Sequence, residues 1–185
     1  MNRLILVVGY VSLCLASGAS ALEGDAALFP EVIEVGATRL VRRGVGRMRR
    51  WMITGADVAL YTEPGLVRNR LLDDVPKALA FYYYVRIRSD QFNDSGLEVL
   101  RENSPAQMLA EHQEDLATYG KLLRDVRRGD RYLLTYEPGR GTALALNGKE
   151  LGLVPGASFA ALYFRIWLGE PPIDARMFES LIKGM

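Results

Sequence analysis

The last third of the chain constrains the fold most, because short apolar runs alternate there with residues that make tight turns. Asn147-Gly148 lies between two short apolar segments, and this pair favours the two-residue turn of a β-hairpin. The stretch 156–168 is apolar and long enough for a buried helix, and Pro171-Pro172 ends it. This order predicts a hairpin that leads into a helix closing a barrel-like or half-open sheet.

The rest of the chain predicts an α+β fold. β-Branched and aromatic runs predict strands over 32–35, 40–61, 77–87, 131–137, 142–146 and 151–154. Apolar periodicity and capping residues predict helices over 66–72, 89–103, 105–127, 156–168 and 174–182. Run 77–87 is almost continuously apolar, so both faces of that strand are expected to be covered. Strands and helices come in groups, which is typical of an antiparallel sheet with helices gathered on one face.

The first residues are typical of an export signal. Arg3 precedes an apolar run, and small residues follow up to Ala19-Ser20-Ala21. The run is shorter than the ~20 residues of a membrane-spanning helix. We therefore predict a signal peptide over 1–21, cleaved after Ala21, and a single periplasmic or secreted domain over 22–185, with no transmembrane segment after cleavage.

Composition excludes several kinds of site. The single cysteine, Cys14, lies in the predicted leader, so the mature domain would have no disulfide, thiolate ligand or cysteine nucleophile. The 23 Lys and Arg residues nearly balance the 22 Asp and Glu residues, which predicts no nucleic acid partner. The single histidine, His112, stands in a polar helical segment, so we expect a solvated helix face and no zinc site or Ser-His-Asp triad. We expect no cofactor, and the sequence specifies no oligomeric state.

A cluster of arginines is the first candidate for chemistry. It comprises Arg42, Arg43, Arg47, Arg49 and Arg50. One interpretation is a solvated strand face. The other is that one arginine lies with its stem along apolar surface, because side chains alternate on a strand and both faces mix arginine with bulky apolar residues. Its guanidinium would then meet a carboxylate or phenolate oxygen, and Asp57, set among small and apolar residues, is a candidate partner.

Two further features stand beside the arginines. Gly44 and Gly46 predict a bend, a bulge or the close approach of another backbone. In Tyr82-Tyr83-Tyr84, alternation places Tyr83 on one face of the strand and its two neighbours on the other. These tyrosines are either packing residues or groups that hold a water or a ligand oxygen while their rings pack.

Taken in order, a series of segments resembles the chalcone isomerase-like family, in its exported bacterial branch. The segments are Phe29-Pro30, Leu40 through Gly-Val-Gly-Arg-Met-Arg-Arg-Trp51, Ala-Asp-Val-Ala-Leu-Tyr61, Val75-Pro-Lys-Ala-Leu79 with the tyrosine strand, Leu100-Arg-Glu-Asn103, Arg128-Gly-Asp130, Tyr136-Glu-Pro-Gly-Arg-Gly141, Asn147-Gly148, Phe159-Ala160 and Ile166-Trp-Leu-Gly-Glu-Pro-Pro172. The resemblance implies an open-faced sandwich, in which a large antiparallel sheet is covered by a layer of helices with a cleft between.

The resemblance also implies two kinds of activity. Some family members close a chalcone into a flavanone, and others bind fatty acids through an arginine that meets the carboxylate. On this basis the ligand-binding residues would be Arg49 or Arg47, Tyr83, Tyr84 and Asn103.

The family's catalytic threonine falls near Ala56 in this chain, which favours a non-catalytic protein. The implied function is binding of a small hydrophobic acid, such as a fatty acid, in the cleft, with no catalytic residue and no metal. The alternative is an intramolecular lyase of the chalcone-flavanone isomerase type, with a water positioned by Tyr83 or Tyr84. A structural envelope protein with a filled cleft is a third possibility.

Overall fold

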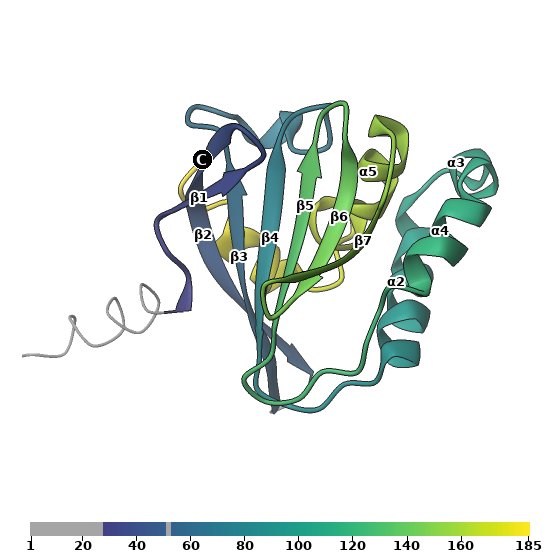
Figure 1. Ribbon diagram of the computed structural model, residues 1–185, viewed down its shortest axis with the longest axis horizontal. Helices are drawn as coiled ribbons and strands as arrows, with labels where there is room; N and C mark the ends of the chain where they lie inside the picture. The colour runs from purple at the N-terminus through teal and green to yellow at the C-terminus, as the bar shows by residue number, and fades with distance from the viewer. Residues whose placement is uncertain (1–27, 51–52) are drawn as a thin grey trace, which may run out of the picture.

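The computed structural model describes residues 28–50 and 53–185, and the predicted signal peptide lies outside these residues. It shows a curled, seven-stranded antiparallel sheet whose strands follow one another in sequence order (Figure 1). The strands are β1 (Val32–Val35), β2 (Thr38–Arg50), β3 (Ile53–Thr62), β4 (Lys77–Tyr83), β5 (Arg131–Glu137), β6 (Gly141–Leu146) and β7 (Lys149–Val154). The predicted α+β open-faced sandwich is confirmed.

The helices fall into two groups along the chain. They are α2 (Ser89–Asn103), α3 (Ala106–Glu111), α4 (Gln113–Gly120), α5 (Ala157–Tyr163), α6 (Arg165–Leu168) and α7 (Ala175–Leu181), with a short 3₁₀ helix η1 (Arg68–Arg70). In Figure 1 the yellow C-terminal helices lie behind the sheet, and α2, α3 and α4 stand at its right-hand side. No helix in the described part of the chain is both long enough and apolar enough to span a bilayer.

The main core lies between the sheet and the helices. Leu79 of β4 is fully buried and belongs to the same cluster as Phe159 and Leu162 of α5 and Leu181 of α7. A smaller cluster covers the opposite face, and there Ala78 is also fully buried. Both faces of β4 are therefore covered, as its apolar sequence predicts.

Several local predictions are confirmed. Asn147 and Gly148 both have positive φ, 51° and 81°, as the predicted hairpin turn requires. The Asp174 carboxylate accepts a hydrogen bond from the backbone N–H of Met177 at 3.0 Å and so caps α7. A Cβ atom added to Gly46 would lie 2.5 Å from the carbonyl oxygen of Met177, so close backbone approach, one of the alternatives predicted for these glycines, occurs there.

Other predicted elements differ from those observed. Segment 40–61 forms two paired strands, with register shifts at Arg42/Gly44 and Met48/Arg49, and not one extended run. The helix predicted to reach 127 ends at Gly120, because Val126 exchanges backbone hydrogen bonds with Ile87 instead. The helix predicted over 156–168 is divided into α5 and α6, and the helix predicted over 66–72 is reduced to η1.

A buried lysine holds the start of β4. Lys77 is fully buried, and its Nζ donates to the carbonyl oxygens of Asp73 and Val75 at 2.6 and 3.1 Å. The ammonium also lies 4.9 Å from the ring centre of Tyr136 and 5.5 Å from that of Phe164. Burial lowers the pKa of Lys77 to about 8, although the nearby carboxylates act in the opposite direction.

This shift predicts that the protein becomes more stable as the pH rises above 8. Between the folded pKa of about 8 and the ordinary value of 10.5, the folded Lys77 loses its proton while the unfolded chain keeps it. The free energy of unfolding should therefore rise by up to ~1.4 kcal/mol per pH unit. Burial raises the pKa of Tyr61 to about 12, so above pH ~10 the unfolded chain releases phenol protons first and stability should fall again.

Denaturant unfolding at half-unit steps of pH, for the wild type and Lys77→Met, would check this prediction. The variant should lose the rise in stability between pH 8 and pH 10 and keep the fall at higher pH. An equal rise in both proteins would show that Lys77 is not its source.

Candidate functional site

Arg47 lies on the sheet face opposite the helices. Its Nε and Nη2 donate to the two carboxylate oxygens of Asp57 at 2.6 and 2.9 Å, and the Tyr84 hydroxyl donates to the same carboxylate at 2.7 Å. The Asp57 side chain is 3 % exposed, whereas that of Arg47 is 48 % exposed. The expected meeting of one arginine with Asp57 is confirmed. Two residues singled out in the sequence, Arg47 and Tyr84, therefore meet each other through a carboxylate.

The other two polar candidates lie elsewhere. Arg49 is exposed, and its backbone N–H donates to the Asp174 carboxylate at 3.3 Å. Asn103, at the end of α2, is buried, and its side-chain amide donates to the carbonyl oxygens of Arg165 and Pro171 at 2.9 and 2.8 Å. Asn103 thus joins α2 to α6 and to the segment that follows α6. The structure does not bring Arg49 or Asn103 together with Arg47 and Tyr84.

Tyr83 lies on the face of β4 that the helices cover, opposite the face of its two neighbouring tyrosines, as alternation along the strand predicts. It is 3 % exposed, and its ring stacks on Phe81 with 6.2 Å between ring centres. Edge-to-face contacts join it to Phe92 of α2 at 5.5 Å and to Tyr132 of β5 at 5.8 Å. Of the five residues predicted to bind a ligand, Tyr83 is the one that faces the interface between sheet and helices.

The helices supply a second set of rings to this interface. Tyr119 of α4 contacts Tyr163 of α5, with ring centres 4.2 Å apart, and both rings contact Phe159. Tyr163 in turn contacts Trp167 of α6, which packs on Phe81 of the sheet. The space between the sheet and its helices is therefore occupied by aromatic side chains.

Several tyrosine hydroxyls are buried within this aromatic interface. Burial raises the pKa values of Tyr83, Tyr119 and Tyr163 well above that of a free phenol, and neighbouring phenols raise them further. Tyr132 is satisfied, because its hydroxyl bonds the backbone of Arg124. The buried hydroxyl of Tyr119 has no hydrogen-bond partner among the described residues. We name Tyr83, Tyr119 and Tyr163 the tyrosine cluster.

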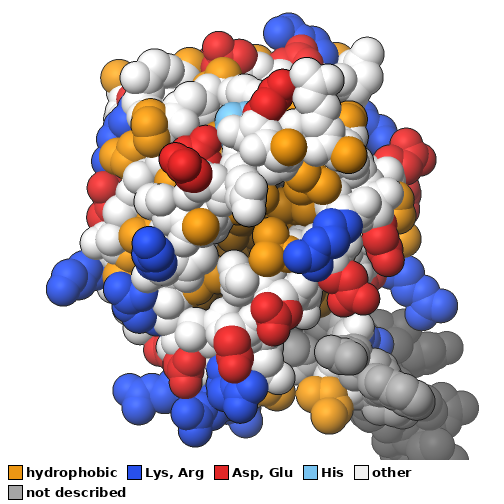
Figure 2. Space-filling model, turned by 90° about the vertical axis from the view of Figure 1, so that its right-hand side faces the viewer, with side chains coloured by type: hydrophobic (Ala, Val, Ile, Leu, Met, Phe, Trp, Pro, Cys, Tyr) orange, Lys and Arg blue, Asp and Glu red, His pale blue; other side chains and the backbone are white. Residues whose placement is uncertain are grey.

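Two hollows lie near the helices. A small one, of about 10 Å³, lies between α2 and α4 and reaches Tyr163 of the tyrosine cluster. A larger groove of about 760 Å³ lies between η1 and the C-terminal helices, where Arg68 and Arg165 border apolar residues such as Leu71 and Phe178. Figure 2 shows the side of the molecule carrying α2, α3 and α4, where hydrophobic side chains are visible inside a hollow among polar ones.

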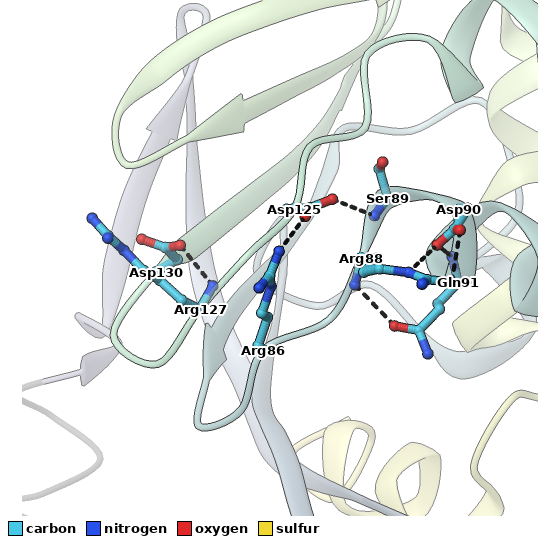
Figure 3. Close-up of polar contacts among 8 residues, drawn as sticks. All are labelled: Arg86, Arg88, Ser89, Asp90, Gln91, Asp125, Arg127 and Asp130. Carbon is cyan, nitrogen blue, oxygen red and sulfur yellow. Dashed lines mark hydrogen bonds and ion pairs between the residues drawn. The ribbon is translucent and has the colours of Figure 1, made fainter.

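The helices α2, α3 and α4 join the sheet through two neighbouring connections, 84–88 and 121–130. Asp125 of the second connection accepts from the backbone N–H of Ser89 at 3.0 Å and from Arg86 at 3.2 Å (Figure 3). The hydrogen bond from the Ser89 N–H holds the pKa of Asp125 below its usual value, and Arg86 adds a smaller effect in the same direction. Because these bonds join the two connections, both ends of the helical layer are attached to the sheet at one place.

His112 does not occupy the solvated helix face expected from the sequence. Its side chain is 13 % exposed and contacts Asp115 and Ser158, a residue of α5 that lies 46 positions later in the chain. The polar residues around His112 in the sequence gave no sign of this contact. Within residues 28–50 and 53–185, no group of three or more His, Cys, Asp or Glu side chains is placed to hold a metal ion.

Sequence reasoning also missed two members of the tyrosine cluster. Tyr119 fits the apolar period of its helix and Tyr163 lies in an apolar run, so neither residue was singled out. A tyrosine in such a position is a usable signal, because its hydroxyl needs a partner when it is buried.

Comparison with known proteins gives two findings. A family model described as chalcone isomerase-like matches residues 21–182. Among solved structures, the chain is similar to a fatty-acid binding protein of Arabidopsis thaliana, with a TM-score of 0.65 and 17 % sequence identity. That match covers 83 % of this chain and 90 % of the other, and at this identity it shows the fold alone. No curated protein matches the chain.

Proposed function

The chain belongs to the chalcone isomerase-like family, and on that basis we propose that it is a non-catalytic protein that binds a small hydrophobic acid, such as a fatty acid, between the sheet and its helices. The similar Arabidopsis structure is that of a fatty-acid binding protein, which supports this proposal. Ala56, where the family resemblance places a catalytic threonine, is fully buried and carries no hydroxyl group, which favours binding over an isomerase. We also propose that the protein acts after export.

The observation that carries the proposal is the unpartnered hydroxyl of Tyr119. A buried polar group without a hydrogen bond lowers the stability of the fold by about 1–3 kcal/mol. A bound ligand that accepts a hydrogen bond from this hydroxyl would remove that cost. An acid group placed among the tyrosine cluster would accept a hydrogen bond from Tyr119, while its alkyl chain would pack against the surrounding rings. The polar end of the ligand would then be held by phenols and not by Arg47 or Arg49.

Binding of this kind requires the helical layer to move. The hollow between α2 and α4 holds about 10 Å³, whereas sites for small ligands are typically ~300–1,000 Å³. Because both connections of the layer are joined at Asp125, α2, α3 and α4 would turn outward about that point, and this movement would break the bonds of Asn103 to α6 and of His112 to Ser158. Ring contacts such as that of Phe92 with Tyr83, together with aliphatic side chains such as Leu100 and Leu116, form the packing of the layer.

Ligand retention and affinity test the proposal. Native mass spectrometry of protein purified after export should show a co-purifying lipid, and displacement of a fluorescent fatty acid should give its affinity. Tyr119→Phe keeps the ring and removes the hydroxyl, so we expect affinity to fall about 5–10-fold. Tyr61→Phe is the matched control, because the Tyr61 hydroxyl is bonded to the Pro30 carbonyl on the other face of the sheet.

The same assay separates the tyrosine cluster from the arginine predicted from the sequence. Arg49→Ala should leave affinity unchanged, because Arg49 is exposed and lies beside α7. Loss of binding in Arg49→Ala together with wild-type affinity in Tyr119→Phe would overturn the site proposed here. Absence of any lipid and of any displacement signal would overturn the binding function itself.

A further inference from the structure

Three side chains at the edge of the helical layer have the connectivity of a serine hydrolase triad. The Ser158 hydroxyl lies 2.8 Å from His112 Nε2, and His112 Nδ1 lies 2.7 Å from a carboxylate oxygen of Asp115. The order serine, imidazole Nε2, imidazole Nδ1 and carboxylate is the one in which a serine is activated as a nucleophile. We propose that Ser158, His112 and Asp115 form an acyl-transfer site that is separate from the tyrosine cluster.

The protonation pattern of the imidazole follows from its two partners. A carboxylate accepts hydrogen bonds, so the contact with Asp115 places the proton of neutral His112 on Nδ1. The lone pair of Nε2 then faces the Ser158 hydroxyl, which donates to it. This is the tautomer that a general base requires.

The local backbone explains why His112 reaches Ser158. His112 is the residue between α3 and α4, and its φ of −110° and ψ of 19° depart from helical geometry there. The imidazole packs edge-on against Phe159, with ring centres 6.0 Å apart, and this contact fixes its plane next to the first turn of α5. Asp115 lies in the first turn of α4 and meets Nδ1 of the ring at 2.7 Å.

The proposed nucleophile is more exposed to solvent than its base. Ser158 is exposed, whereas the His112 side chain is 13 % and that of Asp115 39 % exposed. A carbonyl compound can therefore reach Ser158 from solvent, while the imidazole is shielded from it. Neither of the two hollows described above includes Ser158, so the site fits small esters with short acyl chains and not long lipids.

The reaction has two steps, acylation of Ser158 and hydrolysis of the acyl–serine ester. The Ser158 oxygen forms a bond to the acyl carbon, its proton passes to His112 Nε2, and that proton leaves with the departing alcohol. Water then gives one proton to His112, attacks the acyl–serine ester and releases the carboxylic acid, and Ser158 regains its proton. Asp115 acts as a positioning residue through His112 and touches no reacting atom.

Charge around the site selects among esters. Glu111 and Glu114, on either side of His112 in sequence, are exposed, and Asp115 contacts the imidazole itself. These carboxylates disfavour anionic esters through like-charge repulsion. Neutral esters, such as p-nitrophenyl acetate, are the expected substrates.

Covalent labelling provides the direct test. A fluorophosphonate probe forms an oxygen–phosphorus bond with an activated serine and releases fluoride, and peptide mass spectrometry would locate the label on Ser158 in the full chain. Ser158→Ala should abolish both labelling and the pre-steady-state burst of p-nitrophenol. His112→Asn should lower both by ~10³-fold or more while circular dichroism stays unchanged.

Control variants distinguish an activated serine from a hydroxyl that only makes a structural hydrogen bond. Ser180→Ala removes a hydroxyl that donates to the Arg176 carbonyl and has no histidine partner, so labelling should remain at the wild-type level. Asp115→Asn should slow labelling, although Ser158 and His112 remain. No label on Ser158 after prolonged exposure, or equal labelling of wild type and His112→Asn, would overturn the proposal. Lipid retention by the tyrosine cluster is measured separately and does not depend on either result.

Discussion

Replacing Gly46 with alanine should destabilise the fold by about 2–4 kcal/mol, one of the two largest effects expected in this chain. The new Cβ would lie 2.5 Å from the carbonyl oxygen of Met177 and 2.8 Å from its Cγ. At Gly44 it would lie 2.3 Å from the carbonyl oxygen of Ser180. Since these obstacles are mainly backbone atoms of α7, the clash cannot be relieved by turning a side chain. Either substitution must displace α7 from β2.

Denaturant unfolding of Gly46→Ala and Gly44→Ala would measure this cost. Gly55→Ala is the matched control in the neighbouring strand, because its Cβ would meet its nearest atom at 3.7 Å, an ordinary contact. The control should change stability by less than ~1 kcal/mol. Equal effects at Gly46 and Gly55 would show that α7 does not press on β2 as described.

Disruption of the ion pair between Arg47 and Asp57 should give the second large effect on stability. The loss should depend on which of the two residues is replaced. Arg47→Ala removes the guanidinium from the buried Asp57 carboxylate and leaves the hydrogen bond from Tyr84. We expect the free energy of unfolding to fall by about 3 kcal/mol. Asp57→Ala leaves a guanidinium that is already half exposed and can be hydrated, so we expect a smaller loss of about 2 kcal/mol.

An exposed arginine–carboxylate pair provides the control. Arg140 donates to both carboxylate oxygens of Glu150 at 3.0 and 2.7 Å, but the two side chains are 42 % and 49 % exposed. Glu150→Ala should change the free energy of unfolding by no more than ~0.5 kcal/mol. A loss in Asp57→Ala as small as that in Glu150→Ala would mean that burial adds nothing to the pair.

The sequence predicted the features that depend on a few neighbouring residues. The Asn147-Gly148 turn and the Asp174 cap follow from backbone preferences within one turn of chain. The close approach at Gly46 is one of the three alternatives that the glycines predicted, because a glycine inside a strand makes room for another backbone. Alternation along β4 placed Tyr83 on a different face from Tyr84, and the structure confirms it.

Features that depend on distant residues were not predicted. The sequence suggested that one arginine of the cluster meets a carboxylate, but it did not show that this is Arg47 or that its face of the strand lies away from the helices. The end of α4 at Gly120 is decided by the pairing of Val126 with Ile87, 39 residues earlier, which no local pattern records. The contact of His112 with Ser158 likewise exists only after two separate helices have packed on one sheet.

The manner in which β4 continues into β5 has a consequence for how such proteins diversify. These strands are direct neighbours, and beyond them the Tyr83 N–H donates to the Asp130 carbonyl while Gly129 N–H donates back to Tyr83. Topologically, everything between these residues is one greatly enlarged hairpin loop. Insertions, deletions or wholesale exchange within that single stretch would leave every strand pairing of the scaffold in place. A new lid, and with it a new ligand preference, can therefore be acquired without redesigning the sheet beneath it.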